Sequence, residues 1–460
     1  MQNEFNRAVA LLHSFAYTAA DSAFRKVAEH DPHCAMAHWG IAMAQFHQLW
    51  DPPLSPSAVP VGELEIQRAQ ALGARSDREH RFIDALALIY PRGSTTPYAT
   101  RISRYEHAMC DLPAEERKDT EAIVFCALAL LGNVSPFDKS HVRQKKAAAL
   151  LEPLSLRYPQ HPGITHYLIH AYDNGELAPK GLAAARAYAK IAPSAPHALH
   201  MPSHIFTRLG LWNDSIASNL AARKAAHEQG DIGEELHAMD YLVYAYLQGG
   251  RDSEAAQVLQ QLREMQKLDT ADFKVGYAAT AMPIRYAVER NQWDESANIR
   301  APSGSPPHVT AIAVWARGLG LARTGRVAEA RTETDTLRVL EERLRSSGNR
   351  YWAAQVNILN SELMAWTAEA ANQPDEALAV MSRAADEEDA MEKLPVTPGP
   401  ILPAREQLGY LLLEQRQPCR ARKEFETSLL FAPGRHGALT GASHAAELCG
   451  QSRKAPAVLP

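Results

Sequence analysis

The sequence predicts an all-α fold, an α-solenoid built from repeated helix-turn-helix units. Alanine is abundant along the 460 residues, and glycine and proline recur at intervals of tens of residues. No run that alternates Val, Ile or Thr with polar residues marks a β-strand. Hydrophobic residues make up 46% and charged residues 22% of the chain, so the sequence is that of a folded protein and not of a disordered one.

The repeated units are clearest at the two ends of the chain, where small residues, an aromatic residue and a closing proline recur at helical spacing. These residues are Ala20, Phe24, Pro32 and Trp39-Gly40 at the start, and Leu408-Gly409, Ala421, Phe425 and Pro433 near the end. The pattern resembles the tetratricopeptide repeat (TPR), a helix-turn-helix unit of about 34 residues. The resemblance implies that small residues lie where the two helices touch and that each pair stacks on the next.

The middle of the chain matches the repeat more loosely. Turns between the two helices of a unit are expected at Gly210-Leu211-Trp212, Gly250-Arg251-Asp252, Gly325-Arg326-Val327 and Asn372-Gln373-Pro374. We expect a single TPR-like solenoid over residues 1–450, with irregular breaks at 51–60, 91–98, 301–307 and 395–403, and a disordered tail at 451–460.

Histidine and aspartate gather on the predicted groove-facing side of three successive helices. Positions thirteen, ten and six residues before a turn glycine share one helix face, because a spacing of three and four residues keeps side chains together. Counting back from Gly210 and Gly250, with the unit that ends near Gly175, gives His166, His170, Asp173, His197, His200, His204, His237, Asp240 and Tyr244. Pro202 disfavours helical geometry at Met201, and if the helix begins at Pro202, then His197 and His200 precede it.

Histidines four residues apart on a helix can direct both imidazoles to one ion. The pairs His166/His170 and His200/His204 are therefore predicted ligands of Zn²⁺ or a similar divalent metal. Asp173 and Asp240 could be further ligands, could orient the imidazoles, or could act as general bases. His237 would also handle protons, and Tyr244 could donate to a developing oxyanion.

Other residues at equivalent positions are candidates for binding an organic ligand. Arg285 could pair with a carboxylate or phosphate, Trp315 and Trp366 could stack on the ligand, and His197 lies beside the predicted metal ligands. The alternative for all these histidines and aspartates is that they hydrogen-bond one another or contact a peptide.

Composition excludes several classes of function. The net charge of −5 offers no basic surface for nucleic acid. The five scattered cysteines have no CxxC spacing and are interpreted as core thiols in a reducing compartment, which favours a cytoplasmic location. No apolar stretch is long enough to span a membrane. The motifs GxGxxG, GxxxxGK[ST], GxSxG and HExxH are absent from the sequence.

The segments Thr165 to Asp173 and Pro196 to His204 look like those of a group of uncharacterised bacterial repeat proteins, a likeness that implies the fold and no reaction. Two functions therefore stand open. The first is a metal-dependent enzyme, of hydrolase or lyase type, that acts on a small molecule in the concave groove. The second is a non-enzymatic scaffold that binds a peptide or a partner helix there, without a cofactor.

Overall fold

The structure, a computed structural model, describes residues 1–49, 54–90, 93, 95–112 and 118–454, with residues 451–454 described by their backbone alone. Every regular element in these residues is a helix, which confirms the predicted all-α fold. The chain divides into two compact units, Met1–Ile205 (unit 1) and Phe206–Pro460 (unit 2). Each unit consists of stacked helix pairs, and a single solenoid over residues 1–450 stays a prediction.

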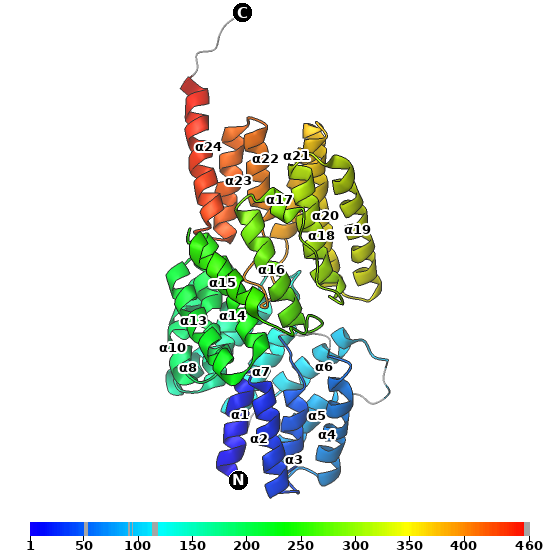
Figure 1. The fold of residues 1–460 in the computed structure, drawn as a ribbon. Coiled ribbons are helices and arrows are strands. Elements are labelled where there is room, and N and C mark those ends of the chain that lie inside the picture. Colours follow the sequence, from blue (N-terminus) through cyan, green and yellow to red (C-terminus); the bar gives the residue numbers. More distant parts are fainter. Residues whose placement is uncertain (50–53, 91–92, 94, 113–117, 455–460) are drawn as a thin grey trace, which may run out of the picture. The chain divides into compact units, whose positions relative to one another are not determined.

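Unit 1 is a series of helices in which each packs on its neighbour in the chain, such as α9 on α10 and, as Figure 1 shows, α1 on α2. Its helices are α1 (Gln2–His13), α2 (Tyr17–His30), α3 (Ala35–Ala44), α4 (Ala58–Leu72), α5 (Asp77–Ala87), α6 (Tyr98–Cys110), α7 (Thr120–Gly132), α8 (Val142–Arg157), α9 (Pro162–Tyr172), α10 (Ala178–Ile191) and α11 (Pro196–His200). The short helix α12 (Pro202–Arg208) contains the residues at which the units divide.

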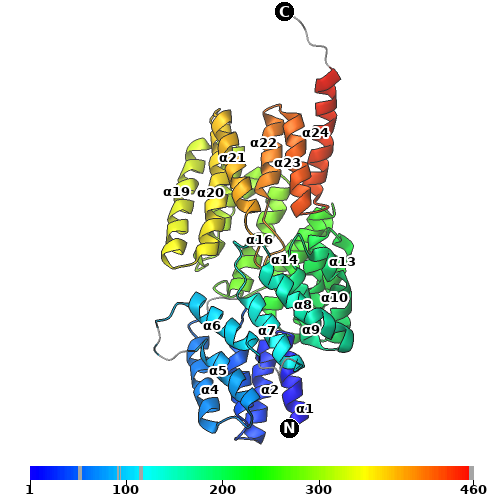
Figure 2. The ribbon, with the colours of Figure 1, turned by 180° about the vertical axis from the view of Figure 1, so that it is seen from behind.

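Unit 2 repeats the arrangement with longer helices, and α22, α23 and α24 lie side by side (Figure 2). Its helices are α13 (Trp212–Gln229), α14 (Ile232–Gln248), α15 (Asp252–Glu264), α16 (Phe273–Glu289), α17 (Trp293–Ser296), α18 (Pro307–Arg323), α19 (Val327–Ser346), α20 (Arg350–Ala370), α21 (Pro374–Asp389), α22 (Ala404–Glu414), α23 (Pro418–Phe431) and α24 (His436–Lys454). The rest of the predicted disordered tail, residues 455–460, lies outside the described residues.

The repeat residues at both ends of the chain lie at helix contacts, as the TPR resemblance implies. A Cβ atom at Gly40 on α3 would overlap the ring of Phe24 on α2. In unit 2, a Cβ at Gly409 on α22 would lie 2.7 Å from the ring of Phe425 on α23. Both phenylalanines are fully buried. The two units therefore share TPR-like helix-turn-helix packing, in which a small residue on one helix admits an aromatic ring from the next.

The four predicted turns lie between consecutive helices of unit 2 or at its start. Gly210, Gly250 and Gly325 have φ of +67°, +68° and +78°, and Asn372 has φ of +58°. Glycine and asparagine enter this left-handed region at the lowest cost, which is why they end helices. Among the described residues of the predicted breaks, 54–57, 93, 95–97, 301–306 and 395–403 are not helical. The breaks were predicted too long, because residues 58–60, 98 and 307 already begin helices α4, α6 and α18, and residues 51–53, 91, 92 and 94 lie outside the described residues.

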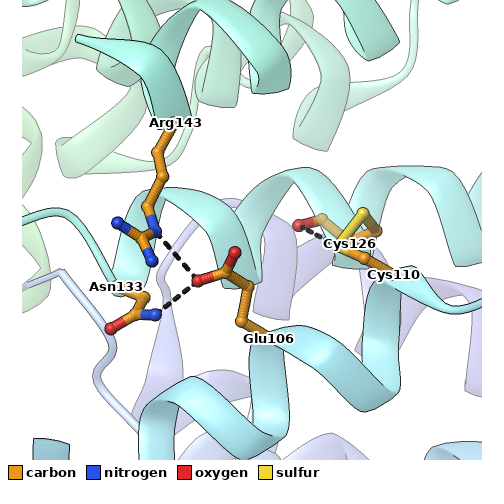
Figure 3. Close-up of a disulfide and its surroundings, with 5 residues drawn as sticks. All are labelled: Glu106, Cys110, Cys126, Asn133 and Arg143. Carbon is orange, nitrogen blue, oxygen red and sulfur yellow. Dashed lines mark hydrogen bonds and ion pairs between the residues drawn. A yellow bond between two sulfur atoms is a disulfide. The ribbon is translucent and has the colours of Figure 1, made fainter. Parts of the chain in front are cut away.

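The cysteine interpretation was wrong. Cys110 on α6 is bonded to Cys126 on α7, and Cys419 on α23 is bonded to Cys449 on α24, while Cys34 is free. Figure 3 shows the first bridge, which joins two packed helices near the ion pair of Glu106 with Arg143. Spacing in the sequence could not predict these disulfides, because the paired cysteines are 16 and 30 positions apart and meet only where their helices pack together. Disulfides are rare in reducing compartments, so they do not favour the predicted cytoplasmic location.

Among the described residues, no helix combines the length and apolar character that crossing a bilayer requires.

Candidate metal centre

Two histidines on α9 direct their rings to the same point. His166 and His170 lie four residues apart, so their side chains leave the same face of the helix. Pro162 occupies the first turn, where its missing N–H costs nothing, and His161 caps the helix by accepting a hydrogen bond from the Ile164 N–H at 3.3 Å. The Nε2 atoms of His166 and His170 are 3.1 Å apart.

His197 on α11 adds a third nitrogen to this point. Its Nε2 lies 3.2 Å from Nε2 of His166. One ring nitrogen from each of the three histidines lies within 4.8 Å of the other two. His166, His170 and His197 are 0%, 8% and 3% exposed. The three residues therefore form a buried cluster of convergent imidazole nitrogens, which we call the histidine triad.

The orientation of His166 is set by a hydrogen bond from the first helix. Its Nδ1–H donates to the backbone carbonyl oxygen of His13 at 2.6 Å. A carbonyl can only accept, so Nδ1 carries the proton and Nε2 presents its lone pair to the centre of the triad. Histidines that bind metals are oriented by this kind of contact.

Aromatic rings enclose the triad. Tyr188 stacks on His166 with a centroid separation of 5.0 Å and an interplanar angle of 15°, and Phe15 contacts it edge-on at 4.4 Å. The Phe15 ring also stacks on His170 and His197. Burial lowers the pKa of His166 well below its ordinary value, and repulsion from His170 and His197 lowers it further. His166 is therefore neutral at pH 7, which is the state that binds metals.

A second pair of histidines lies next to the triad in unit 1. His200 on α11 and His204 on α12 direct their Nε2 atoms at one another at 3.0 Å. His204 Nδ1 contacts a carboxylate oxygen of Asp173 at 2.9 Å, and both side chains are buried. The ring centroids of His170 and His204 are 6.2 Å apart. Asp173 thus orients His204, one of the roles that the sequence left open for it.

The structure groups the predicted metal ligands in a way that helix spacing did not reveal. His166 and His170 are joined by His197, which the sequence analysis assigned to an organic ligand. Of the two alternatives for His197, His200 and His204, the second is confirmed: a helix begins at Pro202, and His197 and His200 precede it, in the short helix α11. Pro202 has no N–H to continue α11.

A third group of polar side chains in unit 1 is satisfied by its own hydrogen bonds. Glu121 lies 2.9 Å from His13 Nε2 and 3.1 Å from His161 Nε2, and His13 Nδ1 contacts the hydroxyl of Tyr167 at 2.9 Å. Burial would raise the pKa of Glu121, but the two histidines hold it far below its ordinary value. Each donor meets an acceptor here, so the group serves as a hydrogen-bond network that positions His13.

The predicted proton-handling residues of unit 2 lie on α14. Asp240 is 1% exposed and forms an ion pair with Arg285, whose Nε donates to it at 2.9 Å. Burial raises the pKa of Asp240, against the opposing charge of Arg285. Tyr244 accepts a hydrogen bond from Arg435 at 3.2 Å, and His237 contacts the ring of Tyr241 edge-on. Catalysis by Asp240, His237 and Tyr244 stays a prediction.

Arg285 and the two tryptophans predicted to bind a ligand are buried within unit 2. Besides Asp240, Arg285 donates to the carbonyl oxygens of Pro400 and Gly399 at 3.0 and 3.2 Å. Trp315 is 0% and Trp366 5% exposed, and Trp366 Nε1 donates to Gln407 at 2.9 Å. These contacts give the three residues a packing role, and ligand binding by them stays a prediction.

Comparisons with known proteins add little to this geometry. No family model matches the chain, and no curated protein matches it. Among solved structures, the P58(IPK) TPR domain is similar over 98% of this chain and 99% of its own, at 14% identity and a TM-score of 0.25. The Cut9–Hcn1 hetero-tetramer of APC/C covers 95% of each chain at 11% identity and a TM-score of 0.30. A structure of Naa15/Naa10 bound to HypK-THB covers 99% of this chain and 97% of its own, at 12% identity and a TM-score of 0.21. TM-scores below 0.5 at these low identities give no information about function.

Proposed function

We propose that unit 1 binds a divalent transition metal ion through His166, His170 and His197, and that the chain is a metal-dependent enzyme of hydrolase or lyase type. The observation that carries the proposal is the convergence of three buried Nε2 atoms, with His166 Nε2 at 3.1 and 3.2 Å from the other two. All three ligands are imidazoles, which suits zinc and related ions and not magnesium or calcium.

A hydrogen-bond network explains the triad less well than a cation does. His166 Nε2 has one lone pair, because its Nδ1 carries the proton. That lone pair cannot accept two good hydrogen bonds at once, yet two other Nε2 atoms face it. The network of Glu121 with His13 and His161 shows the contrast, since each of its two carboxylate oxygens has a separate donor.

The number of ligands supports a catalytic site over a structural one. Three protein ligands leave one position of a tetrahedral ion for water or substrate, as in catalytic zinc sites. His204 with Asp173 forms an oriented imidazole next to the triad, suited to exchanging a proton. His170 is the most exposed of the three ligands, at 8%, so the substrate in this proposal is a small molecule that approaches from its side.

The test is metal binding followed by catalysis. The chain is stripped of metal with a chelator and titrated with Zn²⁺ by calorimetry, and we expect about one tight site per chain. H166A and H197A should lose this site, and H80A should keep it, because His80 is an exposed residue on α5. Tight binding that survives H166A unchanged, or no tight binding by the wild type, would end the proposal.

Hydrolysis is tested on the same samples with p-nitrophenyl acetate and p-nitrophenyl phosphate. Turnover should depend on Zn²⁺ and be lost in H166A. If the site binds zinc but neither probe is hydrolysed, the hydrolase assignment fails while the metal site stands.

The alternative, a scaffold that binds a peptide or partner helix, has less support in the side chains named for it. Arg285, Trp315 and Trp366 are 0%, 0% and 5% exposed, and residues that anchor a partner need accessible surface.

A further inference from the structure

Unit 2 contains a small cavity that is distant in sequence from the triad and has no part in the metal proposal. It has a volume of about 40 Å³, and α16, α18, α20, α21 and the segment 400–402 contribute its walls. This volume exceeds the space that one water molecule needs, roughly 10–15 Å³, but it is far smaller than a drug-sized ligand. The cavity therefore suits the end group of a ligand.

Two carboxylates line the cavity. Glu362 on α20 is 1% exposed, and its Oε2 has no hydrogen-bond partner in the part of the chain that the structure describes. Glu388 on α21 accepts a hydrogen bond from the backbone N–H of Ala404 at 2.8 Å. Burial raises the pKa of Glu388 to about 8, and burial with the nearby Glu388 charge raises that of Glu362 well above its ordinary value. Arg405 and Arg435 lower the pKa of Glu388, and the side chains of Gln407 and Trp315 lower that of Glu362, but burial outweighs both effects.

Two arginines of unit 2, Arg405 and Arg435, form ion pairs with other carboxylates. Arg405 forms ion pairs with Asp386, Asp389 and Glu424. Arg435 forms ion pairs with Glu289 and Glu406, at 2.6 and 2.7 Å. Both arginines lower the pKa of Glu388 through their charge, yet their ion pairs are with other carboxylates, so a bound cation could pair directly with Glu362 and Glu388.

Aromatic rings form another wall. His308 stacks on Trp352 with a centroid separation of 4.8 Å and an interplanar angle of 20°, and Tyr277 lies 5.9 Å from Trp352. Burial lowers the pKa of His308 to about 4, so this ring is neutral at pH 7 and adds no positive charge. Electron-rich ring faces beside carboxylates are the surroundings that bind alkylammonium ions.

We propose that this cavity binds the ammonium group of an organic amine, with Glu362 and Glu388 as counter-ions and Trp352 as the aromatic wall. A metal ion suits this cavity less well, because the ligand atoms of Glu362, Glu388 and His308 do not all lie within 4.8 Å of one another. The ammonium group then donates to the Glu362 oxygen that has no partner, and its charge favours the ionised form of both carboxyls.

The test is calorimetric titration of the full chain with butylammonium, using 1-butanol as the uncharged probe of similar size. We expect butylammonium to bind and 1-butanol not to bind. E362Q keeps the shape of the side chain and should weaken binding by about 10-fold or more, the effect of losing a charged hydrogen bond. E388Q should weaken it in the same direction, and E342Q is the control, because Glu342 is an exposed residue on α19.

The source of the amine is distinguished with Nα-acetyl-lysine-N-methylamide. Tighter binding of this probe than of butylammonium indicates a lysine side chain of a protein, and weaker binding indicates a free amine. Each variant is checked by circular dichroism for its helical content. Equal binding of butylammonium by wild type and folded E362Q, equal binding of 1-butanol, or no binding of butylammonium would overturn the proposal. H166A should bind butylammonium normally, which separates this site from the metal centre.

Discussion

Zinc should stabilise unit 1, and the size of the effect can be worked from the triad. In a tetrahedral site with Zn–N bonds of about 2.0–2.1 Å, the ligand nitrogens lie about 3.3–3.4 Å apart. The measured separations of His166 from His170 and His197 are 3.1 and 3.2 Å. Two of the three separations are thus within a few tenths of an ångström of the bound geometry, and the third, between His170 and His197, is at most 4.8 Å, so a bound ion requires only a small rearrangement.

The expected stabilisation follows from mass action. Free Zn²⁺ at a hundred times its dissociation constant stabilises the folded state by about 2.7 kcal/mol. For a unit of this size, Met1–Ile205, each kcal/mol raises the melting temperature by roughly 2–4 °C. Zinc should therefore raise the melting temperature of the transition that includes unit 1 by about 5–10 °C.

Differential scanning calorimetry of the chelator-treated chain, with and without Zn²⁺, measures this shift. H197A should lose the shift and H80A, which changes an exposed histidine, should retain it, while Mg²⁺ should have no effect on either variant or on the wild type. The reasoning is refuted if zinc leaves the melting temperature of the wild type unchanged, or if H197A shows the same rise as the wild type.

Three further predictions concern stability. Replacing Cys110 and Cys126 together by serine should cost about 3 kcal/mol, since the bridge closes a loop of 16 residues, and urea unfolding measures the loss. Glu406→Ala leaves the fully buried Arg435 without one of its two carboxylates and should cost about 3–5 kcal/mol, again by urea unfolding; a cost below about 1 kcal/mol would contradict it. Glu388 has its pKa raised by burial from 4.5 to about 8, so the folded state holds its proton over a pH range where the unfolded state has lost it. Stability should fall as pH rises from about 5 to about 8, and Glu388→Gln should flatten that fall in melting temperatures taken across the range.

Much of the fold could be predicted because local physics decides it. Glycine or asparagine ends each helix before the turns at Gly210, Gly250, Gly325 and Asn372, where φ is positive in the structure. The glycine and phenylalanine of the repeat pattern could be placed at helix contacts because the TPR resemblance implies a small residue where two helices touch.

Part of the candidate metal centre could be predicted for the same reason. A helix places residues i and i+4 on one face whatever surrounds it, and His166 with His170 and His200 with His204 are found facing one another. The third member of the triad could not be chosen from spacing, since His197 reaches His166 only through the way α11 lies beside α9.

The sequence by itself determined the all-α class, the turns and the two histidine pairs, because each depends on interactions within a few residues. Tertiary structure decided which nitrogens converge, that the His13 carbonyl orients His166, and that Cys110 pairs with Cys126. These contacts join residues from 16 to 153 positions apart, and only the stacking of helices brings such residues together.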